Sequence, residues 1–163
     1  MKNLWAPWRI EYIHNPGKGC FFCDGLKSKD YKKALIVEKG ESAFTIMNRY
    51  PYNSGHLMIA PIRHIGKLEL LDDAEVLELH RLLIRAMKAI KKVMKPQGFN
   101  IGINQGEVAG AGVVGHIHIH LVPRWQGDTN FMPVLADTKV VIEALVKNYD
   151  NIKQALYKLD HPE

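Results

Sequence analysis

The chain has 163 residues, 47% of them hydrophobic and 24% charged, which suits one globular domain with its own core. No apolar run approaches the roughly 20 residues of a membrane span, and residues 1–12 lack the apolar stretch of a signal peptide. We therefore expect a cytoplasmic protein that forms a single domain over residues 1–163, with an N-terminal extension over about 1–19. The net charge of +5 favours an anionic ligand. Because the sequence has no zinc-finger pair and no long basic tail, we do not expect nucleic acid as a partner.

Three short apolar segments in the first half of the chain predict strands. They cover residues 34–39, 43–48 and 56–61. The segment between the second and the third contains a proline, an asparagine and a glycine, which are typical of turns. These segments therefore predict consecutive strands, the last two joined by a turn.

The strongest helix signal covers residues 72–95. Asp72 and Glu75 have the spacing of a reciprocal capping box at its start. Apolar residues recur at intervals of three and four, as on the buried face of a helix. This stripe comprises Val76, Leu79, Leu83, Met87, Ile90 and Met94. A second helix is predicted for the C-terminal segment, at about residues 138–159.

Two alternating segments, 99–104 and 116–122, flank the glycine-rich segment 106–115 and predict an antiparallel hairpin. Together with the three earlier segments they make about five strands. The sequence therefore predicts an α+β fold: a largely antiparallel sheet with one long helix and a C-terminal helix packed on it.

The hairpin's second strand carries His116, His118 and His120 at alternate positions. Successive side chains of a strand point to opposite faces, so the three imidazoles share one face, about 6.6–6.8 Å apart along the strand. This row of histidines has three interpretations: a solvated strand face, a metal site, or a site of nucleophilic catalysis. Neutral imidazole is a good nucleophile toward phosphorus near neutral pH.

The preceding glycine-rich segment favours catalysis on a phosphate. Glycines let backbone N–H groups approach an anion closely, and such concave N–H arrangements bind phosphate. This segment leads directly into the three histidines, although it lacks the Gly-Lys-Ser/Thr ending of a P-loop.

The two cysteines, Cys20 and Cys23, are separated by two residues. This spacing indicates a thiolate metal site or a redox pair, and two free cysteines remain a third interpretation. A redox pair of the thioredoxin kind needs a βαβ context that the sequence does not predict.

The segment His-Ile-His-Ile-His-Leu-Val at 116–122 resembles the motif of the histidine triad superfamily of nucleotide hydrolases and transferases. Residues 48–61 resemble that family's first nucleotide-binding hairpin, and 104–110 precede the triad at the expected distance. Residues 4–9 and 123–131 are similar to the bacterial diadenosine tetraphosphate phosphorylase, or ATP adenylyltransferase-like, branch. The resemblance implies the histidine triad fold.

The resemblance also implies roles for the histidines. His118 would attack the α-phosphorus and form a nucleotidyl-histidine, while the carbonyl of His116 accepts a hydrogen bond from the Nδ1–H of His118. His120 would bind the phosphoryl oxygens. His56 would lie beside the same phosphate or its leaving group.

Further positions carry over in the same way. Asn48 would bind the ribose hydroxyls, and Gln105 matches a glutamine that some relatives place at the bridging phosphates. Gly112 stands where many relatives carry a glutamine or serine that touches the phosphate, and it is followed by Val113. Their backbone N–H groups would take over that contact.

The resemblance extends to a metal site, because some bacterial relatives hold a structural zinc with a C-x-x-C pair and two histidines. Cys20, Cys23, His64 and His116 match those positions. Two thiolates and two imidazoles complete a tetrahedral zinc site with no open position.

We therefore predict an enzyme that cleaves a dinucleoside polyphosphate, with diadenosine tetraphosphate as the expected substrate, and passes the nucleotide from His118 to phosphate or water. Its substrate would arrive with Mg²⁺, and the resemblance implies a homodimer. Three alternatives stay open: hydrolysis of an adenosine phosphoramidate, a non-catalytic nucleotide-binding module, and a metalloprotein that uses all three histidines as ligands.

Overall fold

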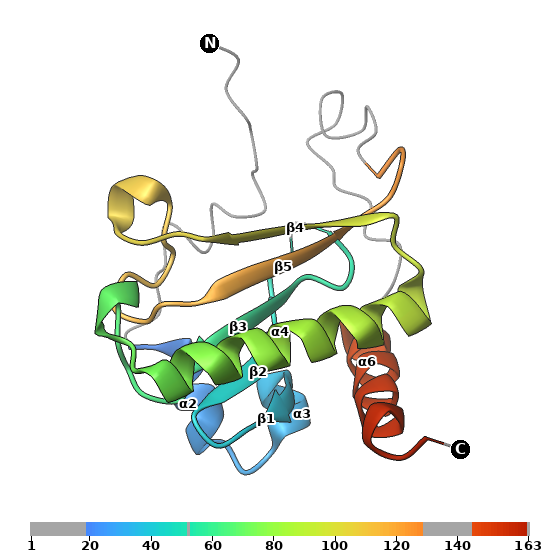
Figure 1. Cartoon of the computed structure of the whole chain (residues 1–163), viewed down its shortest axis with the longest axis horizontal. Coiled ribbons are helices and arrows are strands. Elements are labelled where there is room, and N and C mark those ends of the chain that lie inside the picture. Colours follow the sequence, from blue (N-terminus) through green and yellow to red (C-terminus); the bar gives the residue numbers. More distant parts are fainter. Residues whose placement is uncertain (1–18, 52, 129–144, 163) are drawn as a thin grey trace.

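Five antiparallel strands form one sheet in the order β1-β2-β3-β5-β4 (Figure 1). The structure is a computed structural model that describes residues 19–51, 53–128 and 145–162. The strands are β1 (Ile36–Lys39), β2 (Ala43–Met47), β3 (Leu57–Pro61), β4 (Gly98–Ile103) and β5 (Ile119–Arg124). The predicted α+β class, the five strands and the β4–β5 hairpin are confirmed.

The strand that carries the histidines begins later than predicted. We expected a strand over 116–122, but β5 starts at Ile119, and the chain before it is irregular. The reason lies in its neighbours, because the ladder of β4 against β5 ends with Ile103 opposite Ile119. Upstream of that point the N–H of Ile117 donates instead to the carbonyl of Ile65 at 2.7 Å.

The first strand is also shorter than the predicted 34–39. Helix α3 (Tyr31–Ala34) occupies its expected start, with Asp30 accepting from the N–H of Lys33 at the N-cap. Leu35 then ends this helix in the left-handed region, at φ 65°. The chain can therefore turn from α3 directly into β1.

The long helix α4 (Asp73–Met94) has the predicted capping box of Asp72 and Glu75. Its buried face packs on β2 and β3. Val76, which was assigned to the apolar stripe, is exposed, whereas Glu75 is buried because its carboxylate pairs with Arg63 at 2.7 Å. A short 3₁₀ helix, η2 (Leu68–Leu70), leads into α4.

The C-terminal helix α6 (Leu145–Asp160) packs against α4 and β1. The hydroxyl of Tyr149 connects this helix to the sheet, because it donates a hydrogen bond to the carbonyl of Ile36 at 3.0 Å. The predicted start of this helix, residues 138–144, lies outside the described residues. So do residues 1–18, with most of the N-terminal extension and the 4–9 motif, and the end of the 123–131 motif.

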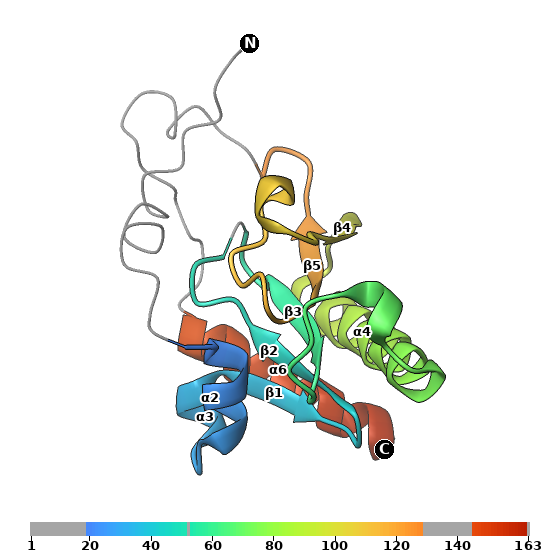
Figure 2. The ribbon, with the colours of Figure 1, turned by 90° about the vertical axis from the view of Figure 1, so that its left-hand side faces the viewer.

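A short helix that the sequence analysis missed, α2 (Phe21–Lys27), lies on the side of the sheet opposite to α4 (Figure 2). Its residue Phe22 is fully buried and packs against Phe44 of β2 on that side of the sheet. Seven residues are too few to show a clear helical period, which explains the omission. None of the helices in the described residues has the length and apolar character that a membrane crossing requires.

Candidate functional site

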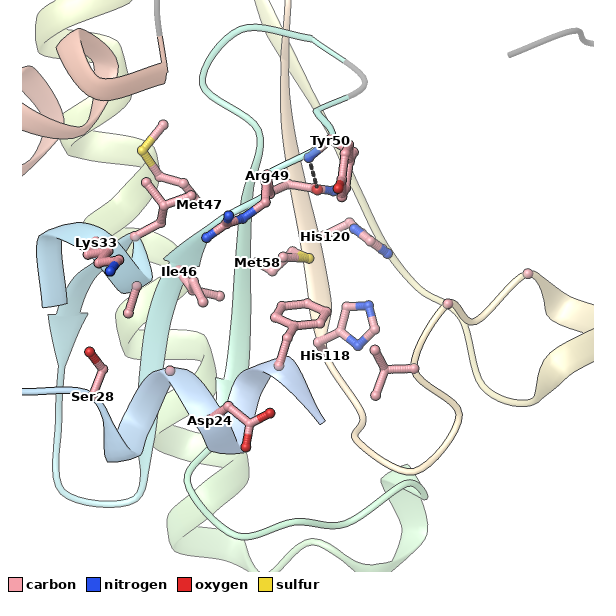
Figure 3. Close-up of a pocket in the computed structure, with 18 residues that line it drawn as sticks. Asp24, Ser28, Lys33, Ile46, Met47, Arg49, Tyr50, Met58, His118 and His120 are labelled. Atoms are coloured by element: carbon pink, nitrogen blue, oxygen red, sulfur yellow. Dashed lines mark hydrogen bonds between the residues drawn. The ribbon is translucent and has the colours of Figure 1, made fainter. Parts of the chain in front are cut away.

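A cavity of about 470 Å³ opens on the α2 side of the sheet. Its floor follows from strand register, because Ile46 of β2 pairs with Met58 of β3, and Met58 pairs with His120 of β5. These three side chains line the cavity together with His118 (Figure 3). The sheet thus places an apolar surface beside two imidazoles.

His118 is held in one orientation and one protonation form. Its Nδ1 lies 2.9 Å from the carbonyl oxygen of His116. A carbonyl only accepts, so Nδ1 carries the proton and the neutral ring keeps its lone pair on Nε2. The side chain is 4% exposed, and this burial lowers the pKa of His118, although the hydrogen bond to the carbonyl partly opposes the effect. His118 is therefore a neutral imidazole at neutral pH, as a nucleophile must be.

His120 lies next to His118, with the ring centroids 4.7 Å apart. Behind it, His56 is 1% exposed and places Nε2 3.0 Å from Nδ1 of His120. Asn48 contacts the opposite side of His56, with Nδ2 3.3 Å from Nδ1. Asn48 and His120 line the cavity, whereas His56, which we expected beside the phosphate, does not. Its strand position just before β3 places it under His120 instead.

The glycine-rich segment forms one rim of the cavity, which Gly110, Gly112 and Val113 line. It contains a short 3₁₀ helix, η3 (Glu107–Ala109), flanked by Gly106 at φ 86° and Gly110 at φ 84°. L-amino acids with a side chain rarely adopt such positive φ angles, so both positions favour glycine.

Gln105 does not line this cavity. Its Oε1 accepts from the N–H of Leu68 at 2.8 Å, and its Nε2 donates to Glu69 at 3.0 Å. Both ends of the amide thus bind the η2 segment. The structure therefore places Gln105 away from the position that the resemblance implied.

Helix α2 contributes a wall that the sequence analysis did not foresee. Phe21, Asp24, Gly25 and Ser28 all line the cavity, and Lys33 of α3 lies near the same wall (Figure 3). Their positions in the chain, 21, 24, 25 and 28, have the spacing of one helical face. That spacing was the available signal, and it was missed because no helix was predicted there.

Four metal-ligating side chains meet at the start of α2. One nitrogen or sulfur atom from each of Cys20, Cys23, His64 and His116 lies within 4.8 Å of the other three. Nδ1 of His116 is 3.3 Å from Sγ of Cys20, and Nδ1 of His64 is 3.3 Å from Sγ of Cys23. The edges of a tetrahedral zinc site with two sulfurs and two nitrogens are about 3.3–3.8 Å. The cluster therefore suits a metal ion.

The protonation of His116 also suits a metal. Its Nε2 lies 2.8 Å from the carbonyl oxygen of Pro61 and must donate to it, so Nδ1 keeps the lone pair that faces the sulfurs. His116 and His118 consequently face different groups, although they stand two residues apart. His116 faces the cysteines, and His118 faces the cavity.

The model of the HIT domain family matches residues 29–127. The chain belongs to the HIT domain family. Within it, the chain is 36% identical over 155 residues to an AP-4-A phosphorylase of Mycobacterium tuberculosis, an alignment that covers 89% of this chain and 79% of that one. A bis(5'-nucleosyl)-tetraphosphatase (asymmetrical) of Schizosaccharomyces pombe is 30% identical over 106 residues, covering 65% and 54% of the two chains.

HIT proteins of known structure share this fold. A zinc-bound histidine triad family protein from Mycobacterium smegmatis superposes with a TM-score of 0.68 at 24% identity, covering 89% of this chain and 98% of that one. At this identity the likeness concerns the fold. The expected histidine triad fold is thereby confirmed. The names of the two relatives support nucleotide processing as the activity.

Proposed function

We propose that this HIT protein cleaves dinucleoside polyphosphates, with diadenosine tetraphosphate as substrate, through a nucleotide held covalently on His118. The observation that carries the proposal is the hydrogen bond from Nδ1 of His118 to the carbonyl of His116. It leaves an unprotonated Nε2 on a buried ring in the wall of a nucleotide-sized cavity. The names of the two relatives, a phosphorylase and a tetraphosphatase, support this substrate class.

In the proposed reaction Nε2 of His118 attacks the α-phosphorus of diadenosine tetraphosphate. The N–P bond forms, the bond from the α-phosphorus to the bridging oxygen breaks, and ATP leaves. His120 and the N–H groups of Gly112 and Val113 would stabilise the charge on the phosphoryl oxygens. Phosphate would then attack the adenylylated histidine and release ADP, whereas water would release AMP.

The nucleoside would lie along the apolar floor and the α2 wall. Ile46 and Met58 offer the apolar surface on which a base can pack, and Asn48 lies where the ribose would connect base and phosphate. The cavity volume of about 470 Å³ is within the range of small-molecule sites. Phe21 on α2 would cover the base from the other side.

We further propose that the cluster of Cys20, Cys23, His64 and His116 binds zinc. Four protein ligands leave no open coordination position, so the ion would have a structural role and would hold the start of α2 beside the triad. Its chemistry when bound is limited to keeping the thiolates and imidazoles together. The zinc-bound relative of the same fold supports this choice of metal.

We also propose a homodimer that forms through the edge strand β4. Ile101 and Ile103 are 48% and 38% exposed there, and among the described strands β4 pairs with β5 alone. An exposed apolar edge strand is a template for pairing with a second chain.

The test is incubation with diadenosine tetraphosphate labelled on the α-phosphate, comparing wild type with His118→Ala. We expect acid-labile label on the wild type alone, with ADP and ATP as products when phosphate is present and AMP and ATP when it is absent. Turnover by His118→Ala at the wild-type rate would refute the proposal. Cleavage of an adenosine phosphoramidate but not of diadenosine tetraphosphate would assign the same chemistry to the other substrate class.

A further inference from the structure

We infer that Asn48 is a positioning residue that decides which nitrogen of His120 carries the proton. This inference rests on the proposed function, in which His120 faces the phosphate. It gives Asn48 a task beyond the ribose contact that the resemblance implies. The structural basis is a chain of three side chains, Asn48, His56 and His120, joined by hydrogen bonds.

The two ends of the Asn48 amide are assigned by a backbone group. Its Oδ1 accepts from the N–H of Tyr50 at 2.9 Å, which Figure 3 marks with a dashed line. Since Oδ1 is used in this way, Nδ2 is the atom that faces His56. The backbone holds the two residues together as well, because the N–H of Asn48 donates to the carbonyl of His56 at 3.0 Å and closes the turn between β2 and β3.

The amide then determines the form of both histidines. Nδ2 of Asn48 can only donate, so Nδ1 of His56 accepts, and the neutral ring carries its proton on Nε2. That Nε2 lies 3.0 Å from Nδ1 of His120 and donates to it. Nδ1 of His120 is therefore the acceptor, and the proton of the neutral ring is on Nε2.

The consequence is that His118 and His120 present opposite groups to the cavity. His118 donates from Nδ1 to a carbonyl and keeps its lone pair on Nε2, the form of a nucleophile. His120 accepts on Nδ1 and carries N–H on Nε2, the form of a donor to a phosphoryl oxygen. Without the amide the pair could reverse, with His120 donating to His56 from Nδ1 and turning a bare Nε2 toward the phosphate, where two lone pairs would repel.

The first test reads the protonated ring nitrogens directly. Long-range ¹H–¹⁵N spectra of the full-length, ¹⁵N-labelled, metal-loaded protein distinguish a protonated from an unprotonated imidazole nitrogen. We expect wild-type His56 and His120 protonated on Nε2 and His118 on Nδ1. A wild-type His120 protonated on Nδ1 alone would overturn the inference.

Two variants extend this test. Asn48→Asp keeps the acceptor for Tyr50 and the shape of the side chain but removes the donor, so we expect Nδ1 of His56 to become protonated. Asn53→Ala is the matched control in the same turn, because its amide donates to the carbonyl of Pro123 and to Asp128, away from the histidines. We expect wild-type ring nitrogens in this control. An unchanged His56 in Asn48→Asp, or a changed one in Asn53→Ala, would contradict the inference.

The second test separates positioning from ribose binding. We expect Asn48→Ala to lower kcat by about 100-fold, as for the loss of one donor at a developing charge. The loss should be the same with a substrate whose ribose lacks the 2′ and 3′ hydroxyls. If Asn48 only binds the ribose, Asn48→Ala should instead raise KM for the normal substrate and should not affect turnover of the substrate without these hydroxyls. That result would overturn the inference. If the wild type shows the expected protonation of His56, His118 and His120 but turns over no nucleotide, only the proposed function is contradicted.

Discussion

Phe22 packs its ring against the imidazole of His118, with the ring centroids 4.9 Å apart. The same ring lies 4.9 Å from His116 and 6.1 Å from Phe44 of β2. Phe22 thus stands between the two cysteines in the sequence and between the metal cluster and the cavity in space. It links the start of α2 to the side chain that we propose as nucleophile.

Replacing Phe22 should therefore reduce both stability and activity. We expect Phe22→Ala to lower the free energy of unfolding by about 3–5 kcal/mol, because it empties a fully buried position. Phe22→Leu should cost less, about 1.5 kcal/mol or under, because it fills most of that space. Urea unfolding measures both values, and kcat should fall further in the alanine variant, whose His118 ring loses its lateral support. A large-to-small change in a core lowers the free energy of unfolding by at least roughly 1 kcal/mol. A smaller loss in Phe22→Ala would show that this ring contributes little to stability.

Metal analysis should find about one zinc ion per chain, because the four ligands form one closed site. We expect Cys23→Ser to lose the ion and to lower the midpoint of thermal unfolding, and a strong chelator to do the same to the wild type. His80→Ala is the matched control, since this exposed histidine on α4 donates to the carbonyl of Val76 in its own helix and does not belong to the cluster. Full zinc content in Cys23→Ser would refute the assignment of this ligand.

Glu78 should make stability depend on acid pH. Its carboxylate caps the turn before β2 by accepting from the N–H groups of Glu41, Ser42 and Ala43 and from the hydroxyl of Ser42. Burial acts to raise the pKa of Glu78, but these hydrogen bonds outweigh it, and the pKa lies below its ordinary value. The stabilisation is thus complete above the pKa of about 4.3 in the unfolded chain and is lost as the pH falls through the folded pKa.

Glu78→Gln tests this sign. We expect it to lower the free energy of unfolding by about 1–2 kcal/mol at pH 7, and the gap to the wild type to narrow below about pH 4. Denaturant unfolding at a series of pH values measures the gap. Glu107→Gln, at an exposed position, should stay within about 0.5 kcal/mol of the wild type throughout. A gap that widens toward low pH would mean that the sign is wrong.

Regular periodicity explains which elements could be predicted from the sequence. The β2 and β3 strands and α4 were predicted to within two residues, because a short apolar run bounded by turn residues marks each strand and a 3.6-residue period extends over the helix. The capping box of Asp72 and Glu75 needs only a local spacing, and the structure has it. Helices α2 and α3 were missed because four to seven residues carry too little periodic signal.

Local sequence by itself determined the residue types of the site: three alternating histidines, a glycine-rich approach and a C-x-x-C pair. Only the tertiary structure decided which group each histidine faces. Strand pairing ends at Ile119, so His116 is turned toward the cysteines while His118 lines the cavity. His56 contacts His120 from behind and does not line the cavity. Hydrogen bonds that span 8 and 64 residues set which nitrogen of His56 and of His120 is protonated. No local pattern specifies such bonds, because they depend on which strands meet and in which register.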